Sequence, residues 1–185
     1  MITGKHVRLR AMEKSDLPFY VRWFNDPEVI CHLKIFQPLS LGQEEQWYAD
    51  VLTKPVEEQP LCIEILQGDE WIFIGNLGFM TINQHDRSAE VGIAIGEKQY
   101  WGKGNGTEAM GLLVKHGFNT LNLNRIYLHV YETNPRAVRS YEKAGFSIEG
   151  RLRQARYLNG RYVDVIIMSI LKDEWKKGLK NEGNK

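Results

Sequence analysis

The spacing of apolar residues near the start of the chain predicts one strand followed by helices. Residues 6–12 alternate between apolar and polar positions, as a half-buried strand does. Behind Ser15, a suitable N-cap residue, apolar residues recur at helical spacing, and these are Leu17, Tyr20, Val21 and Phe24. Asp26-Pro27 ends this helix, because the residue before a proline disfavours helical backbone. One or two further helices, one of them over 42–52, are expected before residue 58.

Three apolar runs in the middle of the chain predict a β-meander. They cover residues 61–66, 71–82 and 89–95 and are separated by turn sequences. A long amphipathic helix follows the glycine-rich stretch 102–106, and its apolar face comprises Met110, Leu113, Val114, Gly117, Phe118 and Leu121. Residues 125–131 then read as a strand with Ile126, Leu128 and Val130 on one side.

The last third of the chain predicts one helix and a hairpin. Asn134-Pro135 has the residue types preferred at a helix N-cap and first turn, and Gly145 suits the end. A strand begins at 146–148, and the segments 156–158 and 161–171 flank Asn159-Gly160, a preferred two-residue hairpin turn. The pattern predicts an α/β fold with a mixed sheet and helices on both faces. We expect a single domain over 1–175 and a polar, frayed tail over 176–185.

Composition narrows the class of protein. The chain has 185 residues, of which 43% are hydrophobic and 25% charged, and its net charge of +1 gives no general attraction to nucleic acid or membrane. No apolar run approaches the roughly 20 residues that cross a bilayer, and the N-terminus does not resemble a signal peptide. Cys31 and Cys62 form no CxxC pair, so the expected compartment is the cytoplasm. The scattered histidines have no metal-ligand spacing, and we expect no metal.

Charge is distributed unevenly along the chain. Residues 26–70 contain ten acidic residues and only Lys34 and Lys54, a balance of −8. Residues 134–161 contain seven basic and two acidic residues, a balance of +5. Two solvated surfaces would explain this. A cationic substrate near the first region and an anionic ligand near the second would explain it equally well.

The stretch Gln99–Thr107 contains the most informative motif. It follows a predicted strand, opens a helix and contains three glycines at alternate positions. Glycines allow positive φ and close approach of a ligand, and the helix start offers unpaired N–H groups, so a pyrophosphate would fit. A Walker loop is excluded because GxxxxGK[ST] is absent. The GxGxG spacing, with no acidic residue about 20 positions on, also argues against a dinucleotide fingerprint. A turn without a ligand remains the simpler alternative.

Two segments together resemble a known family. Gln99–Thr107 resembles the [RQ]xxGx[GA] acyl-CoA loop of the GNAT superfamily of N-acyltransferases, and Asn134–Phe146 resembles its N-x-x-[AS]-x-x-x-Y-x-x-x-G-F stretch. Residues 7–10 and 157–170 are most similar to the branch with ribosomal-protein N-terminal and spermidine acetyltransferases. The resemblance implies a mixed, mainly antiparallel central sheet flanked by helices, with the family's fourth and fifth strands (β4/β5) splayed apart.

The resemblance also implies a reaction. An acetyl group would pass from acetyl-CoA to a primary amine by direct attack in a ternary complex, and the acceptor would be a polyamine or a protein or peptide N-terminus. The alternatives are a non-catalytic acyl-CoA-binding regulatory module and an aminoglycoside acetyltransferase. Dimers are common in this branch, so a homodimer is one candidate assembly.

The implied acetyl-CoA contacts gather around the glycine-rich loop. Amides of residues 102–107 would receive the pyrophosphate, residues 93–95 would pair with the pantetheine arm as an added strand does, Asn134 would bond that arm, and Arg139 would meet a phosphate. A plain N-cap role for Asn134 and a solvated Arg139 or Lys103 are the structural alternatives. The full implied set is Ile93, Ala94, Ile95, Gln99, Gly102, Lys103, Gly104, Gly106, Thr107, Asn134 and Arg139.

Two residues are candidate catalysts. A protonated amine cannot attack a thioester, so a base is needed, and Glu90 shares its strand face with the small residues Gly92 and Ala94, as a ligand groove would require. Glu90 would act directly or through water, unless it is only a surface carboxylate. Tyr141 occupies the family's acid position and would protonate the leaving thiolate. Without the motif, it would be taken for a core aromatic.

Overall fold

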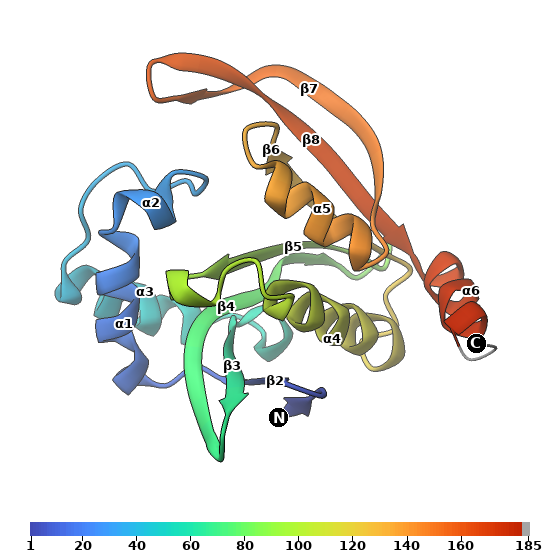
Figure 1. Ribbon diagram of the computed structural model, residues 1–185, viewed down its shortest axis with the longest axis horizontal. Coiled ribbons are helices and arrows are strands. Elements are labelled where there is room, and N and C mark those ends of the chain that lie inside the picture. Colours follow the sequence, from blue (N-terminus) through green and yellow to red (C-terminus); the bar gives the residue numbers. More distant parts are fainter. Residues whose placement is uncertain (183–185) are drawn as a thin grey trace.

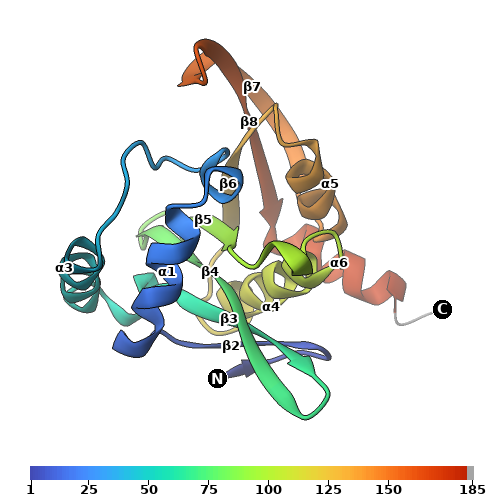
Figure 2. The ribbon, with the colours of Figure 1, turned by 60° about the vertical axis from the view of Figure 1, so that its left-hand side comes forward.

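The fold is a single open sheet with helices on both sides (Figures 1 and 2). A computed structural model describes residues 1–182. Its eight strands lie in the order β1-β2-β3-β4-β5-β6-β8-β7. Every neighbouring pair is antiparallel except β5 and β6, which are parallel. The predicted mixed, mainly antiparallel sheet is therefore confirmed.

The elements follow the predicted order along the chain. The strands are β1 Ile2–Thr3, β2 Val7–Ala11, β3 Leu61–Gln67, β4 Glu70–Asn83, β5 Ser88–Ile95, β6 Arg125–Tyr131, β7 Ser147–Leu158 and β8 Arg161–Leu171. The helices are α1 Leu17–Phe24, α2 Pro27–Ile30, α3 Leu41–Leu52, α4 Asn105–Asn119, α5 Pro135–Lys143 and α6 Lys172–Glu182. Three short 3-10 turns cover Lys14–Asp16, Val56–Glu58 and Lys98–Tyr100. None of the helices within residues 1–182 is both long enough and apolar enough to cross a bilayer.

Strand alternation gives the sheet two separate apolar faces. On β3 and β4, Ile63 and Ile74 pack into a core beneath α4, whereas their neighbours Cys62 and Phe73 pack into a second cluster with α1. The first core also takes Val91 of β5 and continues into β6 and β8. Figure 2 shows α1 and α3 on one side of the sheet and α4 and α5 on the other. We call these the α1 face and the α4 face.

The C-terminal part differs from the expectation in two respects. Residues 176–182 are not frayed but continue the helix α6, because Trp175 packs against Phe118 with ring centroids 5.4 Å apart and anchors its first turns. Residues 183–185 lie outside the described part of the chain. The strand that was expected at 146–148 and again at 156–158 is one long strand, β7, which keeps pairing with β8 across a bulge between Leu152 and Arg156.

Candidate active site

A cleft opens where two neighbouring strands of the sheet separate. β5 and β6 pair only over Ser88–Glu90 and Arg125–Tyr127, and beyond these residues the strands are no longer paired. The cleft holds about 1500 Å³ and is lined by β4, β5, β6, α2, α5, β7 and the loop before α4. Most small-molecule sites hold about 300–1,000 Å³, so this one has room for two substrates. The expected splay is present, between the strands labelled β5 and β6 in this structure.

The glycine-rich loop forms one wall of the cleft. Gly102 and Gly104 have φ of +73° and +87°, a backbone conformation that side-chain-bearing residues rarely adopt. Gly104 is the N-cap of α4, and the first helical hydrogen bond runs from the amide of Glu108 to the carbonyl of Gly104. The amides of Asn105, Gly106 and Thr107 therefore have no partner within the helix. Together with the positive end of the helix dipole, they form a site suited to an anion.

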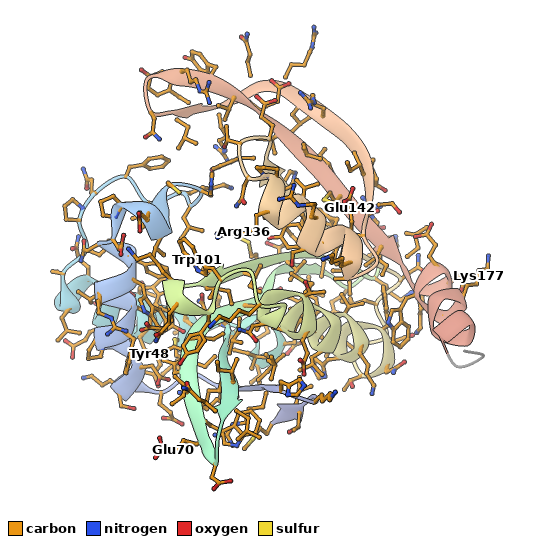
Figure 3. All side chains as sticks on the ribbon, viewed as in Figure 1. Tyr48, Glu70, Trp101, Arg136, Glu142 and Lys177 are labelled. Atoms are coloured by element: carbon orange, nitrogen blue, oxygen red, sulfur yellow. The ribbon has the colours of Figure 1, made fainter. Side chains whose placement is uncertain are left out.

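Helix α5 lies beside this loop and adds positive charge. The hydroxyls of Thr107 and Ser140 are 2.8 Å apart and connect α4 to α5. Arg136, Arg139 and Lys143 project from α5, and all three line the cleft. The guanidinium of Arg136 lies 4.3 Å from the ring centre of Trp101 (both are labelled in Figure 3). Part of the positive charge of residues 134–161 therefore lies in the cleft together with the loop.

Asn134 keeps its capping role in this arrangement. Its Oδ1 accepts a hydrogen bond of 3.1 Å from the amide of Ala137, as an N-cap side chain does. The residue also lines the cleft. Capping uses the oxygen, so the side-chain NH₂ group can still donate to a ligand.

The free edge of β5 faces the opening. Its other edge pairs with β4. The carbonyl of Ala94 points toward that strand, because a Cβ added to Gly75 would lie 2.1 Å from the Ala94 carbonyl oxygen. Since carbonyls alternate along a strand, those of Ile93 and Ile95 point the other way. The carbonyl of Ile95 accepts a 2.7 Å hydrogen bond from Trp101 Nε1. The backbone of Ile93 is therefore the part of this edge best placed to pair with an extended ligand.

Tyr141 reaches the cleft from α5 on the α4 face. Its ring packs against the main core and lies 6.1 Å from the ring of Phe146. Burial raises the pKa of Tyr141 to about 12, because the ionised phenolate would lose its hydration. The phenol therefore keeps its proton at neutral pH and can donate it.

Glu90 lies on the α1 face, at the corner where β5 and β6 part. Its Oε1 is 2.8 Å from Nδ1 of His129, and both residues line the cleft. The sequence pattern excludes His129 only as a metal ligand and does not predict a role for it. Only the pairing register of β5 with β6 places it beside Glu90.

Two residues of the expected set lie outside the cleft lining. Gln99 and Lys103 are exposed, and the Nζ of Lys103 sits 5.5 Å above the ring of Tyr100. The arrangement gives neither side chain a position inside the cleft. All the other residues expected to contact acetyl-CoA line it.

The acidic stretch is largely structural. Glu64 is buried and pairs with Arg8 and Arg10, and Asp26 pairs with Lys98. Of the ten acidic residues in 26–70, only Glu28 and Glu58 line the cleft, where Lys34 and Lys54 of the same stretch also lie. The charge balance of the stretch therefore does not identify an acceptor. In the part of the chain that the structure describes, no three potential ligands gather to hold a metal ion.

Comparison with known proteins gives one consistent result. Residues 6–147 match the sequence profile of the acetyltransferase (GNAT) domain. The chain is 32% identical over 172 residues to spermidine N(1)-acetyltransferase of Vibrio cholerae, which covers 93% of this chain and 96% of the relative. It is 31% identical over 183 residues to the enzyme of the same name from Escherichia coli K12, covering 99% and 95%.

A solved structure is similar over the same length. The crystal structure of spermidine N-acetyltransferase from Vibrio cholerae in complex with CoA and spermine superposes with a TM-score of 0.83 at 33% identity. The match covers 93% of this chain and 99% of that one.

Proposed function

The chain belongs to the GNAT family of acetyltransferases and transfers an acetyl group from acetyl-CoA to an amine, and we propose that this amine is a polyamine such as spermidine or spermine. The proposal rests above all on the full-length similarity to an enzyme whose crystal structure holds CoA and spermine. Four carboxylates also line the cleft, on Glu28, Glu58, Glu90 and Glu108. A polyamine carries several ammonium groups at neutral pH, and these carboxylates offer partners for them.

Acetyl-CoA is held, in this proposal, on the α4 face. The free amides of Asn105, Gly106 and Thr107 receive its pyrophosphate, and Arg139 on α5 meets a further phosphate. The backbone of Ile93 pairs with the pantetheine arm, to which Asn134 donates a hydrogen bond. The structure supports this placement because anion-binding amides, added positive charge and a free strand edge lie along one wall of one cleft. Gln99 and Lys103 make no contact with acetyl-CoA inside the cleft in this proposal, because their side chains are exposed and do not line it.

Acid and base work from opposite sides of the opening. Glu90 lies on the α1 face and drives removal of a proton from the ammonium group of the acceptor. Tyr141 lies on the α4 face, where it protonates the thiolate of CoA as the C–S bond breaks. The amine enters from one face and the thioester from the other, so the two proton transfers do not compete for one side chain.

A thiol-release assay tests the acceptor. Purified protein and acetyl-CoA are mixed with spermidine, with spermine, with peptides of varied N-termini, and with an aminoglycoside. We expect the polyamines to give the highest kcat/KM. A peptide N-terminus or an aminoglycoside that reacted faster than both polyamines would replace the proposed acceptor without affecting the family. A non-catalytic acyl-CoA-binding module would bind acetyl-CoA yet release no thiol with any amine.

We further propose that the protein is a cytoplasmic homodimer. Cys31 and Cys62 are both free thiols, which suits a reducing compartment. β7 is a sheet edge twelve residues long, and it exposes Ile148 and Tyr157. A long, exposed, partly apolar edge invites pairing with another strand, and a second copy of this chain offers an identical one.

A further inference from the structure

Glu90 and His129 occupy different depths of the same corner. Glu90 is opposite Tyr127 at the last paired position of β5 and β6, and His129 follows two residues later on β6, where β5 has already separated. The side chain of His129 is 34% exposed and that of Glu90 is 23% exposed. The imidazole is thus the more exposed member of the pair, and both side chains line the cleft.

The two side chains point to the face on which the amine is proposed to arrive. Val91, Leu128 and Val130 are buried in the core beneath α4. Because neighbouring residues of a strand point to opposite faces, Glu90 and His129 point to the α1 face. The ring of Tyr127, on the same face of β6, packs edge-on against that of His129 with centroids 6.0 Å apart. The imidazole is therefore held both by its neighbour along the strand and by the carboxylate.

The contact fixes which nitrogen of His129 is free. An ionised carboxylate only accepts hydrogen bonds, so Nδ1 of His129 must carry the hydrogen in its 2.8 Å contact with Glu90. The unprotonated nitrogen is then Nε2. An imidazole so oriented can accept a proton at Nε2, and the carboxylate stabilises the imidazolium that forms.

We propose that His129 is a catalytic residue that takes the ammonium proton through Nε2, and that Glu90 is a positioning residue that acts through it. The inference rests on the proposed function, in which Glu90 removes the ammonium proton directly or through water. Here the side chain that takes this proton is His129 instead. Other polar residues of the cleft lining include Arg156 of β7 and Lys143 and Tyr141 of α5. Across β6, His129 pairs with the apolar Ile167 of β8, which offers no competing proton acceptor.

The proton transfers balance over the reaction. Nε2 of His129 takes one proton from R–NH₃⁺, and the nitrogen of R–NH₂ then attacks the thioester carbon. The C–S bond breaks, the sulfur takes the hydroxyl proton of Tyr141, and the second proton lost by nitrogen as the amide forms restores the phenol. His129 releases its proton to solvent. The sum is amide, CoA thiol and one H⁺.

Substitution of His129 by asparagine separates the hydrogen bond to Glu90 from the acceptance of the proton. Asn retains an N–H donor near the position of Nδ1 and can still hold Glu90, but it has no basic nitrogen. With the amine that the wild type acetylates fastest, we expect kcat/KM of H129N and H129A to fall about 100-fold, with unchanged acetyl-CoA affinity. Added imidazole should restore part of the activity of H129A, but none of it when E90Q is also present. The double variant H129N/E90Q should be no slower than H129N, because the two residues act as one unit.

The matched control is His85→Ala, in an exposed turn outside the cleft, and it should leave kcat/KM unchanged. Thermal melts establish that each variant is folded, and H129N carries the test alone if H129A does not fold. If H129N retained activity within about threefold of wild type while E90Q lost it, Glu90 would be the base and the inference would be overturned. If the proposed acceptor class is wrong, the wild-type enzyme will show low kcat/KM with the polyamines of the substrate panel. If this inference is wrong, only the ratio of the kcat/KM of each variant to that of the wild type will differ from the expected value.

Discussion

At the scale of single residues, the chemistry depends on where side chains and glycines sit relative to the sheet opening. Tyr141 shows this most directly. Its hydroxyl has no protein hydrogen-bond partner within residues 1–182, and burial raises its pKa to about 12. A phenol with this pKa is protonated at neutral pH, so it has a proton to donate to a thiolate formed next to it and is not itself a base.

Replacing Tyr141 by phenylalanine removes only the acid. We expect kcat to fall about 100-fold because the thiolate must leave unprotonated, while the dissociation constant of acetyl-CoA, measured by calorimetry, stays the same. Tyr162→Phe is the control, since Tyr162 is 64% exposed on the β8 hairpin and lies outside the cleft. Unchanged turnover in Y141F would remove Tyr141 from the mechanism.

The loop glycines give a second prediction at this scale. Alanine at Gly104 must adopt φ near +87°, which costs about 1–2 kcal/mol, or else rotate the amides that follow it. We expect G104A to lower the free energy of unfolding, to raise the KM for acetyl-CoA, or to do both.

Gly111 offers the matched control in the same helix. Its φ is not positive and nothing lies within 4 Å of an added Cβ, so G111A should stabilise the protein by about 0.5–1 kcal/mol with no change in KM. Urea unfolding and steady-state kinetics measure both quantities. Equal effects of the two substitutions would contradict the special role of the loop conformation.

At the scale of elements, helix α3 contains a charge without a partner. Glu44 is 5% exposed, and its Oε2 is buried with no hydrogen bond within the described residues. Desolvation raises its pKa, because burial penalises the ionised form. A carboxyl whose pKa is higher in the folded than in the unfolded state favours folding below its ordinary pKa, and that contribution is lost as the pH rises through the raised value.

Glu44→Gln should therefore stabilise the protein at neutral pH. The expected gain in the free energy of unfolding is about 1 kcal/mol, and it should shrink as the pH is lowered through the raised pKa of Glu44. Glu45→Gln, next to it and exposed beside Lys14, should change stability by less than about 0.5 kcal/mol. A loss of stability in E44Q at pH 7 would indicate that the ionised carboxylate has a partner not visible in the isolated chain.

At the scale of the whole molecule, the sheet ends in an unpaired edge at β7. If two copies pair there, the apolar side chains of this strand become buried. We expect Ile148→Lys, which places a charge at a 54% exposed position of β7, to convert a dimer to a monomer in sedimentation experiments. Leu66→Lys, at a 42% exposed position of β3 far along the sheet order, is the control and should remain dimeric. A wild-type protein that sediments as a monomer at every soluble concentration would contradict the proposed homodimer.

The local sequence determined most of the elements and the anion-binding loop. Apolar periodicity placed the core faces of α4 and β6, Asn134 and Gly145 marked the ends of α5, and the glycine-rich stretch 102–106 marked the beginning of α4 to within two residues. These signals act within a few residues, because caps, turns and strand alternation depend on neighbours along the chain. They also placed Tyr141 two turns into a correctly predicted helix, whereas its expected role as the acid came from the family resemblance.

Only the tertiary structure decided which distant side chains meet. The pairing of Glu90 with His129 depends on the parallel register of β5 and β6, which no local pattern specifies. The same holds for Glu44, which is acidic in sequence yet buried, and for α6, whose polar sequence is ordered by the packing of Trp175 on Phe118. The physical reason is common to all three. Burial and proximity arise from contacts between segments dozens of residues apart, and these form only when the whole sheet is assembled.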